Sequence, residues 1–133
     1  MAGEQPLGAL EFIYAPSADV ARDVGWFAEV LGAEVRFAIE DEGTHVAMLR
    51  LGDGPPLLVT DHLPDDRPIF LYRVSRLADA EKDLTERGWS PERSIELPMG
   101  PATTFRSPGG VRLAIFEATR PFVVDSFIGR RDF

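Results

Sequence analysis

The sequence predicts an α+β domain built from two tandem β-α-β-β-β modules. Two observations favour this fold class: the same order of strand-like and helix-like segments occurs twice, and a shift of 56 residues places Gly32 on Gly88, Ile39 on Ile95 and Gly54 on Gly110. Neither half is large enough to close a core alone, so we expect one domain over residues 1–133. Its expected parts are module one (about 8–61), a linker (62–67), module two (about 68–118) and a tail (119–133).

Module one begins with a strand over Leu10–Ala15, which is rich in β-branched and aromatic residues. Ser17 is placed to cap a helix that has apolar residues at helical spacing, and Gly32 is placed to end it. Three short apolar runs follow and predict three strands over Ala33–Ile39, Thr44–Leu51 and Pro56–Thr60.

Module two repeats this order, with a strand over Pro68–Val74 and a helix that Ser75 is placed to cap and Gly88 to end. Three further strands are predicted over Ile95–Leu97, Thr103–Arg106 and Val111–Glu117. In the tail, Phe122, Val123, Phe127 and Ile128 predict a short amphipathic turn or helix that packs on the modules or on a partner subunit.

Composition excludes several classes of function. The chain has no cysteine, which excludes disulfides, thiolate nucleophiles and Cys-ligated metals. Its net charge of −8 disfavours nucleic-acid binding, which needs a basic surface. The sequence shows neither a signal-peptide pattern nor about 20 consecutive apolar residues, so we expect a cytoplasmic protein that does not bind membranes.

Three segments resemble the vicinal oxygen chelate (VOC) superfamily, the group of glyoxalase I, bleomycin resistance proteins and extradiol dioxygenases. Asp19–Gly32 (DVARDVGWFAEVLG) resembles the family's first helix, and Ile69–Leu77 (IFLYRVSRL) its fifth strand and second helix. Phe105–Gly110 (FRSPGG) is similar to its strand-turn segment. The resemblance implies a glyoxalase/bleomycin resistance-like fold, in which each module forms half of a cleft or half-barrel and two chains form a homodimer.

Enzymes of this superfamily bind a divalent metal through one residue on each of four strands. The resemblance carries these positions onto Phe12, Leu58, Ile69 and Ala114, with Glu11 replacing Phe12 if the Ala15–Ser17 segment holds one extra residue. At most one of the four can bind a metal, whereas familiar zinc sites use at least three protein ligands. We therefore expect no metal and no cofactor at the usual site.

Strand alternation predicts which side chains would line the cleft if Phe12 and Ile69 face it. They form an apolar wall with a few polar groups, which favours a small-molecule pocket, with a filled core as the alternative. The predicted ligand-binding residues are Phe12, Tyr14, Met48, Leu58, Thr60, Ile69, Leu71, Arg73, Thr104, Arg106, Ala114 and Phe116.

Few residues are candidates for catalysis or for binding charged groups. Glu11 and His45 are weak acid–base candidates. Arg50 and Arg106 are equivalent under the 56-residue shift and could bind an anion, but we favour structural ion pairs with Glu40 and Glu96, which are equivalent in the same way.

Three functions remain open from the sequence. The first is a metal-free protein, similar to antibiotic resistance proteins of the bleomycin type, that binds a small organic ligand of cationic or aromatic character in the cleft. The second is a VOC-type enzyme (lyase, isomerase or dioxygenase) with a rearranged or absent metal site. The third is a structural or regulatory dimer with a vestigial cleft.

Overall fold

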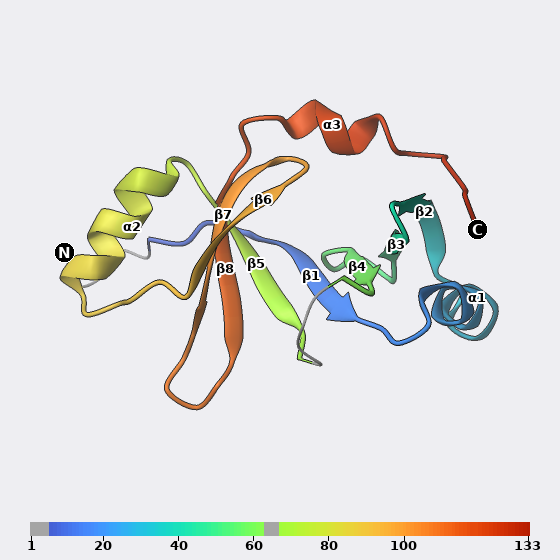
Figure 1. Ribbon diagram of the computed structural model, residues 1–133, viewed down its shortest axis with the longest axis horizontal. Helices are drawn as coiled ribbons and strands as arrows, with labels where there is room; N and C mark the ends of the chain where they lie inside the picture. The colour runs from blue at the N-terminus through green and yellow to red at the C-terminus, as the bar shows by residue number, and fades with distance from the viewer. Residues whose placement is uncertain (1–5, 63–66) are drawn as a thin grey trace. The chain divides into compact units, whose positions relative to one another are not determined.

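The computed structural model of the chain describes residues 6–62 and 67–133, so most of the predicted linker (residues 63–66) lies outside the described residues. The elements follow the predicted order (Figure 1). In the described residues they are β1 (Leu10–Pro16), α1 (Val20–Leu31), β2 (Glu34–Asp41), β3 (Thr44–Arg50), β4 (Leu57–Thr60), β5 (Ile69–Val74), α2 (Leu77–Glu86), β6 (Arg93–Leu97), β7 (Gly100–Arg106), β8 (Arg112–Glu117) and α3 (Pro121–Asp125).

The chain divides into two compact units, which we name after their long helices. The α1 unit comprises Phe12–Ile69 and Asp125–Phe133, and the α2 unit comprises Met1–Glu11 and Phe70–Val124. Each unit is therefore completed by a segment from the opposite end of the sequence.

In the α1 unit, the strands follow the order β2-β3-β4-β1. β1 is parallel to β4, and the other neighbouring strands are antiparallel. The apolar stripe of α1, with Val20 and Val24 at its centre, packs on one face of this sheet against Ala38, Ala47 and Leu49. Burial of this stripe holds the helix on the sheet, because helices of this length are marginal in water on their own.

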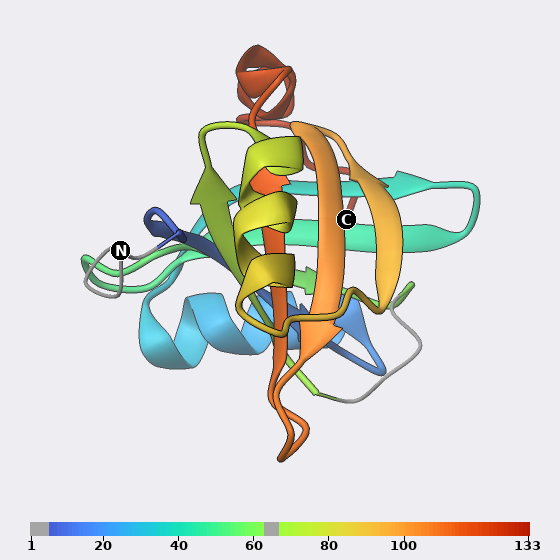
Figure 2. The ribbon, with the colours of Figure 1, turned by 90° about the vertical axis from the view of Figure 1, so that its left-hand side faces the viewer.

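In the α2 unit, the strands follow the order β5-β8-β7-β6, and α2 lies across one face (Figure 2). The core under the helix joins Ala80 and Leu84 to Val74 and Ile115 on the strands. At its margin, Trp89 packs edge-to-face against Phe105, with ring centroids 5.5 Å apart.

The two units repeat one topology. The order β2-β3-β4-β1 of the α1 unit corresponds strand by strand to β6-β7-β8-β5 of the α2 unit. The helix follows the first strand in both cases. The predicted fold class, α+β with two tandem β-α-β-β-β modules, is therefore confirmed.

The helix starts differ from the prediction. At α1, Asp19 rather than Ser17 is the N-cap, and its carboxylate accepts a hydrogen bond from Arg22 N–H (3.1 Å). At α2, the N-cap residue is Arg76 rather than Ser75, and its side chain makes no capping bond. There the Glu117 carboxylate, at the end of β8, accepts from Leu77 N–H (2.8 Å).

The tail contains the short helix α3, in which no residue is buried and Phe122 is 68% exposed. Beyond α3 the chain ends beside β2 (Figure 1). None of the helices in the described residues has the length and apolar character needed to cross a membrane.

Candidate functional site

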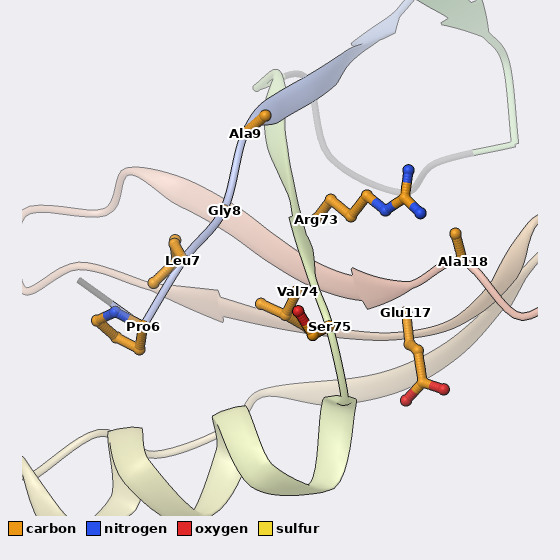
Figure 3. Close-up of a pocket in the computed structure, with 9 residues that line it drawn as sticks. All are labelled: Pro6, Leu7, Gly8, Ala9, Arg73, Val74, Ser75, Glu117 and Ala118. Carbon is orange, nitrogen blue, oxygen red and sulfur yellow. The ribbon is translucent and has the colours of Figure 1, made fainter. Parts of the chain in front are cut away.

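A groove in the α2 unit lies where β5 and β8 end and the segment before β1 passes them. Its volume is about 590 Å³, within the range of small-ligand sites. Its lining residues, shown in Figure 3, are Pro6, Leu7, Gly8, Ala9, Arg73, Val74, Ser75, Glu117 and Ala118. We call it the strand-end groove. A second cavity of about 320 Å³ shares Pro6, Val74 and Ser75 with it and extends along α2 past Asp79 and Asp83.

The segment before β1 is held against β5 by its backbone. Gly8 N–H donates to Arg73 O (2.8 Å), and Arg73 N–H donates to Ala9 O (2.9 Å). A side chain at position 8 would not fit, because its Cβ would lie 2.5 Å from Arg73 O. Glycine therefore allows the close approach that forms one wall of the groove.

Arg73 supplies the positive charge of the strand-end groove. Its side chain is 52% exposed, and its Nη1 lies 3.7 Å from Glu11 Oε1. An exposed pair at this distance contributes little to stability, so the guanidinium can exchange Glu11 for an anionic ligand. The sequence-predicted residues Glu11 and Arg73 are thus brought together as an ion pair.

Glu117 supplies the negative charge. Figure 3 shows its side chain directed toward the start of α2 and that of Arg73 extended to the side where Ala118 lies. The Glu117 carboxylate accepts the Leu77 N–H, so the positive end of the α2 dipole stabilises its charge. With the Ser75 hydroxyl, the strand-end groove therefore offers a cation, an anion and a neutral hydrogen-bonding group.

His45, the other acid–base candidate, lies in the α1 unit between two carboxylates. Its Nδ1 is 2.7 Å from Asp61 Oδ2, and its Nε2 is 3.5 Å from Glu40 Oε2. The hydrogen bond to Asp61 raises the pKa of His45 above its usual value. Burial pushes the pKa of Asp61 upward, but the hydrogen bonds from the His45 backbone and ring outweigh it and lower that pKa. The contacts of His45 therefore favour its protonated form.

His62, from the predicted linker, lies beside this cluster. Its ring Nδ1 is 2.5 Å from Thr60 Oγ1, and that hydroxyl also contacts the His45 carbonyl (3.0 Å). Both histidines are therefore at one end of the sheet of the α1 unit. In the described ranges 6–62 and 67–133, no three His, Cys, Asp or Glu side chains form a group that could hold a metal ion.

Most predicted cleft residues are buried on the sheet faces that do not carry a helix. In each strand they alternate with residues of the helix-side cores, such as Ala47 and Val59 in the α1 unit and Ile115 in the α2 unit. Those with at most 6% exposure are Tyr14, Met48, Leu58, Thr60, Ile69, Leu71, Thr104, Ala114 and Phe116. Phe12 is half-buried, and Arg73 and Arg106 are exposed. Burial raises the pKa of Tyr14, which keeps its phenol neutral. The role of these residues in ligand binding stays a prediction.

The four positions that correspond to family metal ligands do not fit a metal. Leu58, Ile69 and Ala114 are buried at 0–4% exposure and carry no ligating atom. Glu11, the remaining possible ligand, is paired with Arg73. We therefore derive no chemical step through a metal.

The partners predicted for Arg50 and Arg106 are wrong. Arg106 Nε contacts Glu92 Oε2 at 2.6 Å, and the nearby arginines lower the pKa of Glu92, Arg106 most strongly through this hydrogen bond. Glu96 instead pairs with Arg120. Glu40 contacts His45, and Arg50 donates to Gly52 O. These contacts join strand ends to turns, which the 56-residue shift cannot show.

Sequence reasoning missed most of the strand-end groove. The sequence predicts Glu117 only as the last residue of a strand and Ser75 only as a helix cap, and it indicates no role for Leu7–Ala9. The groove depends on three segments that are remote in the sequence coming together. The acidic residue at the end of β8 was the available signal.

Comparison with solved structures identifies the fold. Methylmalonyl-CoA epimerase from Mycobacterium tuberculosis is 16% identical over 93% of this chain and 97% of that chain, with a TM-score of 0.72. A hypothetical protein from Bacillus halodurans is 12% identical over 82% and 93%, with a TM-score of 0.69. A variant of the Streptomyces coelicolor epimerase in complex with 2-nitronate-propionyl-CoA is 15% identical over 86% and 96%, with a TM-score of 0.67.

No protein-family model matches the sequence, and no curated protein does. At this level of identity the structural neighbours define the fold. The chain has the fold of the VOC superfamily, as its helix and strand segments indicate.

Proposed function

We propose that this chain is a VOC-type enzyme that acts, without the family's metal quartet, on a small organic anion bound in the strand-end groove. The observation that carries the proposal is the groove itself, where Arg73, Ser75 and Glu117 line one cavity of about 590 Å³. A few polar groups in a cavity of this size are typical of small-molecule sites.

The charge of Arg73 supports an anionic ligand. Its guanidinium matches the geometry of a carboxylate or phosphate, and its present partner Glu11 is half-buried and 3.7 Å away. This proposal differs from the cationic ligand that the net charge suggested, because the exposed charged residue that lines the groove, Arg73, is positive.

The neighbours support the enzyme over the metal-free binding protein. Those of stated function are methylmalonyl-CoA epimerases, and several are in complex with 2-nitronate-propionyl-CoA or methylmalonyl-CoA. Epimerisation beside a carbonyl requires proton transfer, for which a carboxylate is a suitable base. In this chain Glu117 would take that role, and Arg73 would hold an anionic group of the ester.

The metal-free binding protein remains the second candidate. It is favoured by the apolar residues at Leu58, Ile69 and Ala114, where the superfamily's enzymes place metal ligands. In this case the strand-end groove binds its ligand without turnover. The homodimer and the cytoplasmic location stay predictions, and light scattering tests the first.

Deuterium exchange separates the two candidates. The chain is incubated in D₂O with methylmalonyl-CoA or propionyl-CoA, and α-carbon exchange is followed by mass spectrometry while calorimetry measures binding. We expect exchange by the wild type, binding without exchange by Glu117→Gln, and at least ~10-fold weaker binding by Arg73→Gln. The exposed Arg50 lies in the other unit, so Arg50→Gln is the matched control and should behave as wild type.

Two kinds of outcome would contradict the proposed function, and each leads to a different conclusion. Binding that depends on Arg73 without any exchange supports the binding protein and overturns the enzyme. If neither ester binds, or if Arg73→Gln binds as well as wild type, the strand-end groove is not a site for acyl-CoA anions.

A further inference from the structure

The C-terminal residues pair with the edge strand of the α1 unit through backbone hydrogen bonds and an isolated parallel β-bridge between Ala38 and Arg131. Gly129 N–H donates to Arg36 O (2.7 Å), Ala38 N–H to Arg130 O (2.9 Å) and Asp132 N–H to Ala38 O (2.7 Å). β2 is the last strand in the order of this unit, so the segment satisfies backbone groups that an edge strand leaves open. We call residues 127–133 the C-terminal clasp.

The C-terminal clasp holds both faces of that edge. The Phe127 ring packs edge-to-face on Phe37, with centroids 5.5 Å apart. Phe133 instead packs against the helix-side core that contains Ala38. Because Phe37 and Ala38 are consecutive strand residues, the clasp passes around the edge from one face to the other.

His45 lies where the clasp meets β2 and the end of β4. Its ring packs edge-to-face against Phe133, with centroids 5.2 Å apart. Its nitrogens contact Asp61 and Glu40, and the Glu40 N–H donates to the Asp132 carboxylate of the clasp (2.9 Å). A protonated His45 therefore lies between two carboxylates under the clasp, with its ring against that of Phe133.

The other charges of the clasp are paired among themselves. Arg130 Nη2 lies 2.8 Å from Asp132 Oδ2, with Asp41 adding to the negative field at Arg130. Arg131 Nε donates to Phe133 O. Removal of the His45 proton thus leaves Asp61 and Glu40 without the cation that joins them, beside the carboxylate of Asp132.

We propose that protonated His45 locks the C-terminal clasp onto β2, and that loss of this proton releases the clasp and opens the β2 edge. The lock is complete below the ordinary pKa of 6.5 for histidine and is lost as pH rises through the raised pKa of His45. In acid solution, Arg130 and the Glu40 N–H lower the pKa of Asp132 below its ordinary value of 3.8. The contact between the Asp132 carboxylate and the Glu40 N–H therefore persists below that pH. The clasp is therefore closed in mildly acid solution and open in alkaline solution.

Amide hydrogen exchange of the full chain, followed by NMR as protection factors, tests the lock. Between about pH 6 and about pH 9, we expect the amides of Ala38, Glu40 and Asp132 to lose about tenfold or more of their protection. The amide of Ala47, at the centre of the same sheet, should keep its protection and reports that the fold is intact.

Three variants complete the test. His45→Gln should show weak clasp protection at every pH, and Asp61→Asn should move the midpoint to lower pH, because Asp61 raises the pKa of His45. His62→Gln, the matched control, should keep the wild-type profile. Clasp protection that does not change with pH in the wild type, or a wild-type profile in His45→Gln, would overturn the proposal.

Discussion

At the scale of single residues, Glu117 has two tasks. Its carboxylate caps α2 by accepting the Leu77 N–H, and it lines the strand-end groove. The capping bond comes from a residue 40 positions away, so α2 depends on β8 for its first turn. The same bond fixes the position of the carboxylate in the strand-end groove.

Substitutions at position 117 separate the two tasks. We expect Glu117→Ala to lower the free energy of unfolding by about 1–2 kcal/mol, since an α2 backbone N–H loses its partner. Glu117→Gln should cost much less, because an amide oxygen can still accept that bond. Urea denaturation measures both, with Glu86→Ala, at the far end of α2, as the exposed control. Equal stability of the Ala and Gln variants would show that the cap is unimportant.

At the scale of elements, the strands and helices follow from local sequence. Alternation and helical spacing place β1, α1, β3 and β8 within about two residues of the predicted bounds. The parts that could not be predicted depend on remote residues: the cap of α2 by Glu117 and the pairing of the clasp with β2. Neither leaves a periodic pattern in the chain.

Alanine substitutions at two glycines should have opposite effects on the stability of the protein. A Cβ at Gly25 in α1 would meet no atom within 4 Å, so Gly25→Ala should stabilise the protein by about 0.5–1 kcal/mol through helix propensity. Gly100 begins β7 at φ 154°, and a Cβ there would lie 1.9 Å from Glu117 O. Gly100→Ala should therefore cost at least about 2 kcal/mol. Thermal and urea unfolding measure both, and a destabilised Gly25→Ala variant would contradict the assignment of free space there.

At the scale of the whole molecule, the repeated order of strands and helices made the fold predictable. The strand-end groove was not predictable in this way. The 56-residue shift and the VOC-like segments around Trp26 and Phe105 lead to the observed topology, because each module is a local unit. The strand-end groove forms only after the segment before β1 reaches β5, and Gly8 permits that approach for a steric reason that the sequence alone does not reveal.

The proposed function needs no metal at Phe12, Leu58, Ile69 and Ala114, the positions that correspond to the metal ligands of VOC enzymes. This claim is tested most directly by elemental analysis of untagged full-length protein purified without chelator. Because Phe12, Leu58, Ile69 and Ala114 offer no ligating side chain, we predict far less than one zinc, nickel, manganese, cobalt or iron per chain. A stoichiometric divalent metal that survives dialysis would contradict the claim.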